Sequence, residues 1–237
     1  MTLIVTCLAP DFLIHVSDRR LTRPDDGEIV EEEATKAIQF GRQFIWGYTG
    51  LAALPEPRYY VKTDFWLLER LKADGRTTIE RVVGDATAAI ARTRLKPEQK
   101  RHAFVAIGWR PAQPRPKPVL IVVSNALGVD LRWVTRAEST FVTCIYEMPP
   151  GMEFAVREFG QGFNPRERAR VERLVARALA HGPICVARTS SMPCKVLLQG
   201  TMPWVTALGR DTALGGSGHA WSRCLDAVCT ARHSTLR

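Results

Sequence analysis

The sequence predicts a mixed α+β fold in which amphipathic helices pack outside β-sheets. Three observations predict it: apolar, β-branched runs near the start, apolar residues at helical spacing in the middle, and strand-like runs that return before a last amphipathic helix. The 237 residues are 46% hydrophobic and 24% charged. This balance is typical of a globular protein with a sizeable core.

The N-terminal part is predicted to form two pairs of strands. Turn residues separate the strands, namely Ala9-Pro10-Asp11 in the first pair and Gly41-Arg42 in the second. The polar stretch 23–33 between the two pairs is predicted to be a loop. The expected strands are 2–8, 12–16, 35–40 and 43–48.

Two helices are predicted next, packed as an antiparallel pair. The apolar face of the first is expected to consist of Val61, Phe65, Leu68 and Leu71. Residues 77–80 resemble a capping box at the start of the second helix, with Thr77 as the cap and Glu80 reaching back. The apolar face of the second helix is expected to consist of Ile79, Val82, Val83, Ala86 and Ile90.

Further strands are predicted at 102–109, 118–124, 131–135 and 140–146, and one more is considered at 195–198. A third helix is expected to begin at Asn164-Pro165, a cap followed by proline in the first turn, and to stop at His181-Gly182-Pro183. One face of this helix carries Arg166, Arg170, Arg173 and Arg177. That stripe is either a solvated face or a binding surface for phosphates or an acidic partner.

Charge and cysteine spacing restrict the classes of function. The net charge is +9, but no polybasic block concentrates it, so nucleic-acid binding is not expected. No apolar run approaches the roughly 20 residues that a membrane helix needs. No basic leader precedes the first apolar stretch, so we expect a cytoplasmic protein. Cys224, Cys229, His233 and His219 lack the tight spacing of zinc ligands, and we expect no metal and no cofactor.

Several N-terminal residues, none of which indicates a function by itself, occur in an order that is typical of a known family. Thr2-Leu3-Ile4-Val5 begins a strand, and the second strand ends in Asp18-Arg19-Arg20 with Thr22 close behind. Lys36 lies on the third predicted strand, and Tyr48-Thr49-Gly50-Leu51-Ala52 closes the fourth. This order resembles a proteasome β-type subunit, and the chain is similar to a bacterial proteasome-related member of the N-terminal nucleophile (Ntn) hydrolases.

The resemblance implies a four-layer αββα sandwich and a threonine-dependent amide hydrolysis. Removal of Met1 would free the α-amine of Thr2, which would act as the base for its own hydroxyl. Lys36 would favour the neutral amine and the reactive alkoxide, Asp18 would hold Lys36 charged and oriented, and Arg20 would support the turn carrying Asp18. The Gly50 N–H would face the developing oxyanion.

The implied substrate is a peptide or another small amide, cleaved through an acyl-threonine intermediate, and the implied assembly is a homo-oligomer. Gly160-Gln161-Gly162 lacks the serine of the family's later Gly-Ser-Gly stretch, so it is not included in the site. The alternative is a catalytically inactive binding or assembly protein that keeps the fold, which retention of Met1 would favour. We expect an Ntn-like domain over 1–182 and an atypical C-terminal segment over 183–237, which either completes the sandwich or is poorly ordered.

Overall fold

A computed structural model describes residues 3–10, 12–18, 21–22, 28–31, 34, 36–40, 44–72, 79–113, 115–128, 134–160, 164–180, 194–200 and 205–208. These residues form a mixed α/β structure of three α-helices and several antiparallel sheets. None of the helices in these ranges is long and apolar enough to cross a membrane.

The first sheet has five antiparallel strands built around the N-terminal hairpin. Its order is β12 (Ala155–Gly160), β1 (Leu3–Leu8), β2 (Phe12–Asp18), β13 (Cys194–Gly200) and β14 (Val205–Leu208). The hairpin between β1 and β2 is closed by the Ala9 N–H, which donates to the Phe12 carbonyl at 3.0 Å. All six residues of β1 are buried, so this strand lies in the interior of the molecule.

The second sheet also has five antiparallel strands. Its order is β11 (Val142–Glu147), β10 (Lys117–Ser124), β9 (Ala103–Arg110), β6 (Phe44–Thr49) and β5 (Ala37–Phe40). Two small hairpin-like sheets accompany it, β3 (Leu21–Thr22) with β4 (Ile29–Glu31), and β7 (Ala53–Pro55) with β8 (Tyr60–Lys62). A short 3₁₀ turn, η1 (Pro97–Gln99), precedes β9.

The two five-stranded sheets pack face to face. Ile4, Leu8 and Leu13 of the first sheet lie in one apolar cluster with residues of β5, β6, β9 and β10 in the second. This arrangement explains the continuous apolar runs of β1 and β9. A strand with one face in solvent would instead alternate apolar and polar residues.

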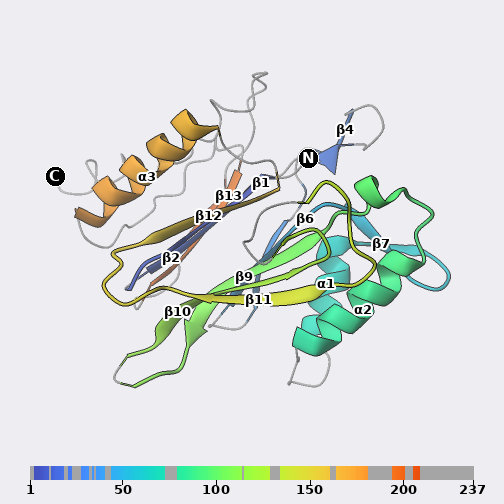
Figure 1. Ribbon diagram of the computed structural model, residues 1–237, viewed down its shortest axis with the longest axis horizontal. Coiled ribbons are helices and arrows are strands. Elements are labelled where there is room, and N and C mark those ends of the chain that lie inside the picture. Colours follow the sequence, from blue (N-terminus) through green and yellow to red (C-terminus); the bar gives the residue numbers. More distant parts are fainter. Residues whose placement is uncertain are drawn as a thin grey trace.

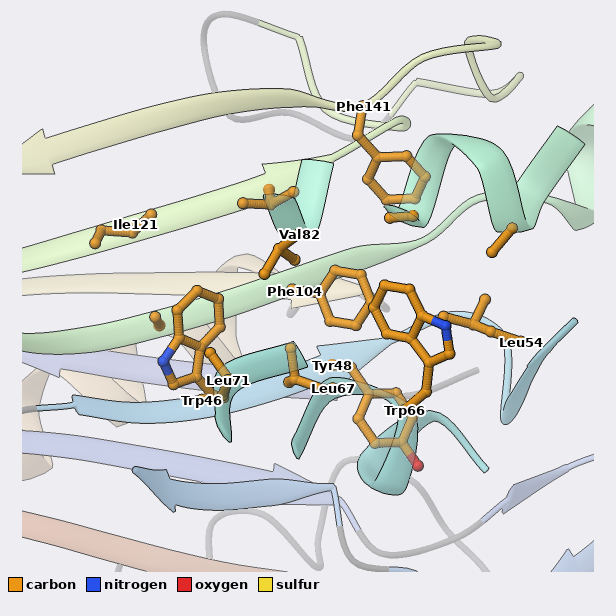
Figure 2. Packing of buried hydrophobic residues seen from close by; sticks show 14 of the residues in the cluster. Trp46, Tyr48, Leu54, Trp66, Leu67, Leu71, Val82, Phe104, Ile121 and Phe141 are labelled. Atoms are coloured by element: carbon orange, nitrogen blue, oxygen red, sulfur yellow. The ribbon is translucent and has the colours of Figure 1, made fainter. Parts of the chain in front are cut away.

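Helices α1 (Thr63–Lys72) and α2 (Ile79–Ala91) cover the other face of the second sheet (Figure 1). Figure 2 shows the aromatic core between these helices and the strands, in which the Trp66 ring stacks on Phe104 with centroids 5.5 Å apart. Aromatic side chains bury large apolar areas, so this contact contributes strongly to the packing of α1 on the sheet. The members shown with labels are Trp46, Tyr48, Leu54, Trp66, Leu67, Leu71, Val82, Phe104, Ile121 and Phe141.

Helix α3 (Pro165–Ala180) lies beside the first sheet, on the side away from the second (Figure 1). Its predicted start is confirmed, because the Asn164 Oδ1 accepts the N–H groups of Arg166 and Glu167, both at 3.0 Å, and Glu167 accepts the Asn164 N–H. An ion pair of 3.2 Å joins Arg168 to Glu158 of β12. On the arginine stripe Arg166, Arg170 and Arg173 are exposed, and the Arg177 side chain lies outside the described part.

Some sequence predictions were wrong in detail. The buried face of α1 consists of Thr63, Trp66, Leu67 and Leu71, whereas the predicted member Phe65 is 58% exposed. The helix begins only at Thr63, and the stacking of Trp66 on Phe104 sets its rotation.

Two strand predictions also need correction. The predicted loop 23–33 contains β4, which pairs with β3, and residues 134–135 of the predicted strand 131–135 are not in a strand. Strands β3, β7, β8, β12 and β14 were not predicted at all, and Val61, expected on the first helix, lies in β8. The capping-box residue Thr77 lies outside the described ranges.

Candidate active site

Three of the predicted site residues lie at strand ends that meet at the same end of the two sheets. Strand β2 ends at Asp18, β5 begins directly after Lys36, and β6 ends directly before Gly50. Because β5 and β6 are antiparallel, the start of one and the end of the other coincide, and the Tyr48 N–H donates to the Lys36 carbonyl at 3.3 Å. The topology therefore collects residues that are far apart in the sequence.

Lys36 and Asp18 form a buried ion pair that joins the two sheets. The Lys36 Nζ lies 3.5 Å from the Asp18 Oδ2, the lysine side chain is fully buried, and that of Asp18 is 19% exposed. Burial lowers the pKa of the Lys36 ammonium below its usual value, and the nearby carboxylate of Asp18 opposes this by raising it. A lysine placed here needs its carboxylate partner to remain charged.

The beginning of β1 lies at the same edge as this pair. Ile4 pairs with Ser17, the residue before Asp18, and Leu3 pairs with Gly160 at the end of β12. The predicted nucleophile Thr2 and the predicted supporting residue Arg20 lie outside the described residues.

Gly50 occupies a backbone conformation that requires glycine. Its φ is +111°, and a Cβ atom there would lie 2.3 Å from the Arg101 carbonyl oxygen and 2.8 Å from the His102 Cα. The next amide, the Leu51 N–H, donates to the His102 Nδ1 at 3.0 Å. The turn after β6 is thus packed directly against residues 101–102.

Sequence reasoning missed two polar side chains close to the pair. His15 and Ser17 of β2 are fully buried, and the Ser17 Oγ has no hydrogen-bond partner among the described residues. His15 contacts β6, because a Cβ on Gly47 would lie 2.4 Å from the His15 Nε2 and 3.1 Å from the Lys36 carbonyl oxygen. The available signal was that polar residues take alternate positions in the otherwise apolar strand FLIHVSD.

This arrangement suits proton handling next to the start of β1. A buried ammonium with a lowered pKa lies beside a carboxylate, and a glycine turn with a fixed backbone follows on the neighbouring strand. In the part of the chain that the structure describes, no group of three or more His, Cys, Asp or Glu side chains could hold a metal ion. The four Cys and His residues discussed above as a metal site, 219, 224, 229 and 233, lie outside that part.

No protein family model matches the sequence, and no curated protein matches it either. An activity must therefore be inferred from the geometry of the site and from the order of residues 2–50.

Proposed function

We propose that this chain is a proteasome-related Ntn hydrolase that cleaves peptide or other small amide bonds through an acyl-threonine intermediate. The observation that carries the proposal is the buried Lys36–Asp18 pair, 3.5 Å apart, at the sheet edge where β1 begins. Burying a lysine is costly, and a buried, paired lysine with a perturbed pKa is characteristic of functional sites.

The fold supports the same proposal. Two antiparallel five-stranded sheets pack face to face, α1 and α2 cover one outer face, and α3 lies beside the other sheet (Figure 1). We propose that this arrangement is the four-layer αββα sandwich of the Ntn hydrolases. In such a sandwich the nucleophile begins a central strand, as residue 2 would before β1.

In the proposed reaction, loss of Met1 frees the Thr2 α-amine. The Thr2 hydroxyl oxygen attacks the amide carbonyl carbon, and the hydroxyl proton passes to the α-amine. The tetrahedral oxyanion accepts a hydrogen bond from the Gly50 N–H. The C–N bond then breaks, the leaving amine takes the proton, and water hydrolyses the resulting threonine ester.

Lys36 acts on this reaction through its charge. A nearby ammonium disfavours protonation of the Thr2 amine, whose ordinary pKa of about 7.7–8.0 is already close to neutrality, and so keeps more of it able to accept a proton. Asp18 keeps Lys36 charged and oriented. We also propose that the protein is a homo-oligomer, as its resemblance to proteasome subunits implies, and that it is cytoplasmic.

The first test is the intact mass and N-terminal sequence of the purified protein, followed by reaction with a β-lactone. We expect a chain that begins at Thr2 and gains the mass of one lactone, because ring opening transfers the acyl group without a leaving fragment. Thr2→Ala should abolish the adduct, and Thr143→Ala, which changes an exposed threonine on β11, should retain it. A chain that keeps Met1 and forms no adduct refutes the enzyme assignment and favours an inactive binding or assembly protein with this fold.

A further inference from the structure

The turn after β6 is held from both sides by fully buried side chains. The Leu51 N–H donates to the His102 Nδ1 at 3.0 Å, and the Leu51 carbonyl accepts the Thr63 hydroxyl at 2.7 Å. The Thr63 N–H also donates to the Ala52 carbonyl at 2.9 Å. His102 and Thr63 are both 0% exposed, so the side-chain partner in each of the two bonds to Leu51 is shielded from water.

His102 is itself held in place by β10 and the residue after it. The main-chain N–H of His102 donates to the Asn125 Oδ1 at 2.9 Å, and its main-chain carbonyl accepts the Ser124 hydroxyl at 2.9 Å. The imidazole packs edge-on against Phe104, with ring centroids 4.6 Å apart. The two hydrogen bonds fix the backbone of His102, and the packing against Phe104 restricts the rotation of its ring.

Gly50 lies between two anchored neighbours. Thr49 belongs to β6 and pairs with Ala103 of β9, while Leu51 is held by His102. The close approach of Gly50 to the backbone of residues 101–102 leaves no space for a side chain. The peptide before Gly50, which carries the Gly50 N–H, therefore continues from β6, and the peptide after Gly50 is held by the His102 ring.

One nitrogen of the His102 ring forms a hydrogen bond, and the other has no partner among the described residues. Its Nδ1 accepts the Leu51 N–H, which places the ring proton on Nε2, and Nε2 has no hydrogen-bond partner among the described residues. A buried polar atom without a partner costs stability that an apolar side chain would avoid. The bond to Leu51 is the interaction that an apolar side chain could not replace.

We propose that His102 is a positioning residue, which fixes the Leu51 amide and thereby aims the Gly50 N–H at the oxyanion. The inference rests on the proposed function, because only an acyl-transfer site needs that N–H aimed. His102 does not touch the reacting atoms. It acts through the backbone of residues 50–51.

Two substitutions separate the hydrogen bond from the volume of the ring. In His102→Asn the Oδ1 can take the place of Nδ1 as acceptor, whereas His102→Leu provides no acceptor. We expect the Leu51 amide to exchange with solvent about tenfold faster in the leucine variant, and within about twofold of wild type in the asparagine variant. Acylation by the β-lactone should follow the same order, slowed about tenfold or more in the leucine variant only.

The wild-type protein provides a test that does not depend on folding of the variants. ¹⁵N spectra of histidine-labelled protein should show His102 with its proton on Nε2; a proton on Nδ1 would overturn the inference. Equal Leu51 exchange in wild type and the leucine variant would overturn it as well.

A different result would refute the proposed function itself. A wild-type chain that begins at Thr2 but is not acylated refutes the hydrolase, and with it the catalytic part of this inference. In that case the exchange data still decide whether His102 fixes the Leu51 amide.

Discussion

Replacing Asp18 with asparagine tests the energetics of the buried ion pair. The change keeps the shape of the side chain and removes its charge, while the fully buried ammonium of Lys36 stays in place 3.5 Å away. At an effective dielectric constant of about 20, a pair at this distance has a Coulomb energy of about 5 kcal/mol. Removing one partner of a buried pair typically costs about 3–5 kcal/mol, because the other group must either keep its charge in a buried environment without that partner or give up its proton.

We expect a cost near the lower limit, about 3 kcal/mol, because the Asp18 side chain is 19% exposed and water reaches it. Urea unfolding followed by tryptophan fluorescence measures this cost, since Trp46 and Trp66 are buried. The matched control is Glu158→Gln on β12, which lies in the same sheet on the far side of β1. Its partner Arg168 lies 3.2 Å away but is 46% exposed, so this change should cost less than about 1 kcal/mol.

The double variant Asp18→Asn/Lys36→Met completes the test. Methionine removes the ammonium and fills a similar volume, so most of the lost stability should return. If Asp18→Asn costs no more than Glu158→Gln, or if adding Lys36→Met brings nothing back, the assignment of a buried charge pair is wrong.

Three further predictions concern glycine and histidine positions. Gly50→Ala should lower the free energy of unfolding by about 3 kcal/mol, since a positive φ adds strain of about 1–3 kcal/mol and the Cβ meets backbone atoms. The control Gly84→Ala on α2, where the Cβ meets open space, should raise it by about 0.5–1 kcal/mol. Urea midpoints that move alike in both variants would contradict this. Gly47→Ala should cost about 1–3 kcal/mol and shift the NMR resonances of His15, whose ring must move; an unchanged His15 spectrum would refute the contact. Burial lowers the pKa of His102 from 6.5 to about 3, so the unfolded chain binds the extra proton between these values and stability falls as the pH falls below 6.5. Between pH 7 and pH 5 the wild type should lose about 2 kcal/mol more than His102→Asn, and parallel pH profiles would show that His102 is not buried and neutral.

The fold could be predicted from the sequence where a residue pattern is compatible with only one kind of secondary structure. The apolar hairpin of β1 and β2 and the apolar face of α2 follow from spacing alone, as does the start of α3 at Asn164. The rotation of α1 was not predictable, because Phe65 and Trp66 are both large aromatics in adjacent positions. Which of the two is buried depends on Phe104, nearly forty positions further along the chain.

The candidate site was predictable only in part. The order of Asp18, Lys36 and Gly50 in the sequence pointed to the residues, but nothing local shows that Lys36 is buried. The burial of His15 and His102 could not be predicted from the sequence, since His15 packs against Gly47 of another strand and His102 against Gly50 of another turn. The predictions for Thr2 and Arg20 remain predictions.

The sequence by itself determined the three helices and most of the longer strands, and it set the chemistry that residues 2–50 can offer, because spacing and residue type are local properties. Only the tertiary structure decided that the ends of β2 and β6 and the start of β5 meet at one place, with a lysine buried against a carboxylate. The pairing of β13 with β2, which brings a late segment into the N-terminal sheet, was also decided there. Long-range pairing depends on which apolar faces and strand edges fit together, and no short window of sequence contains both partners.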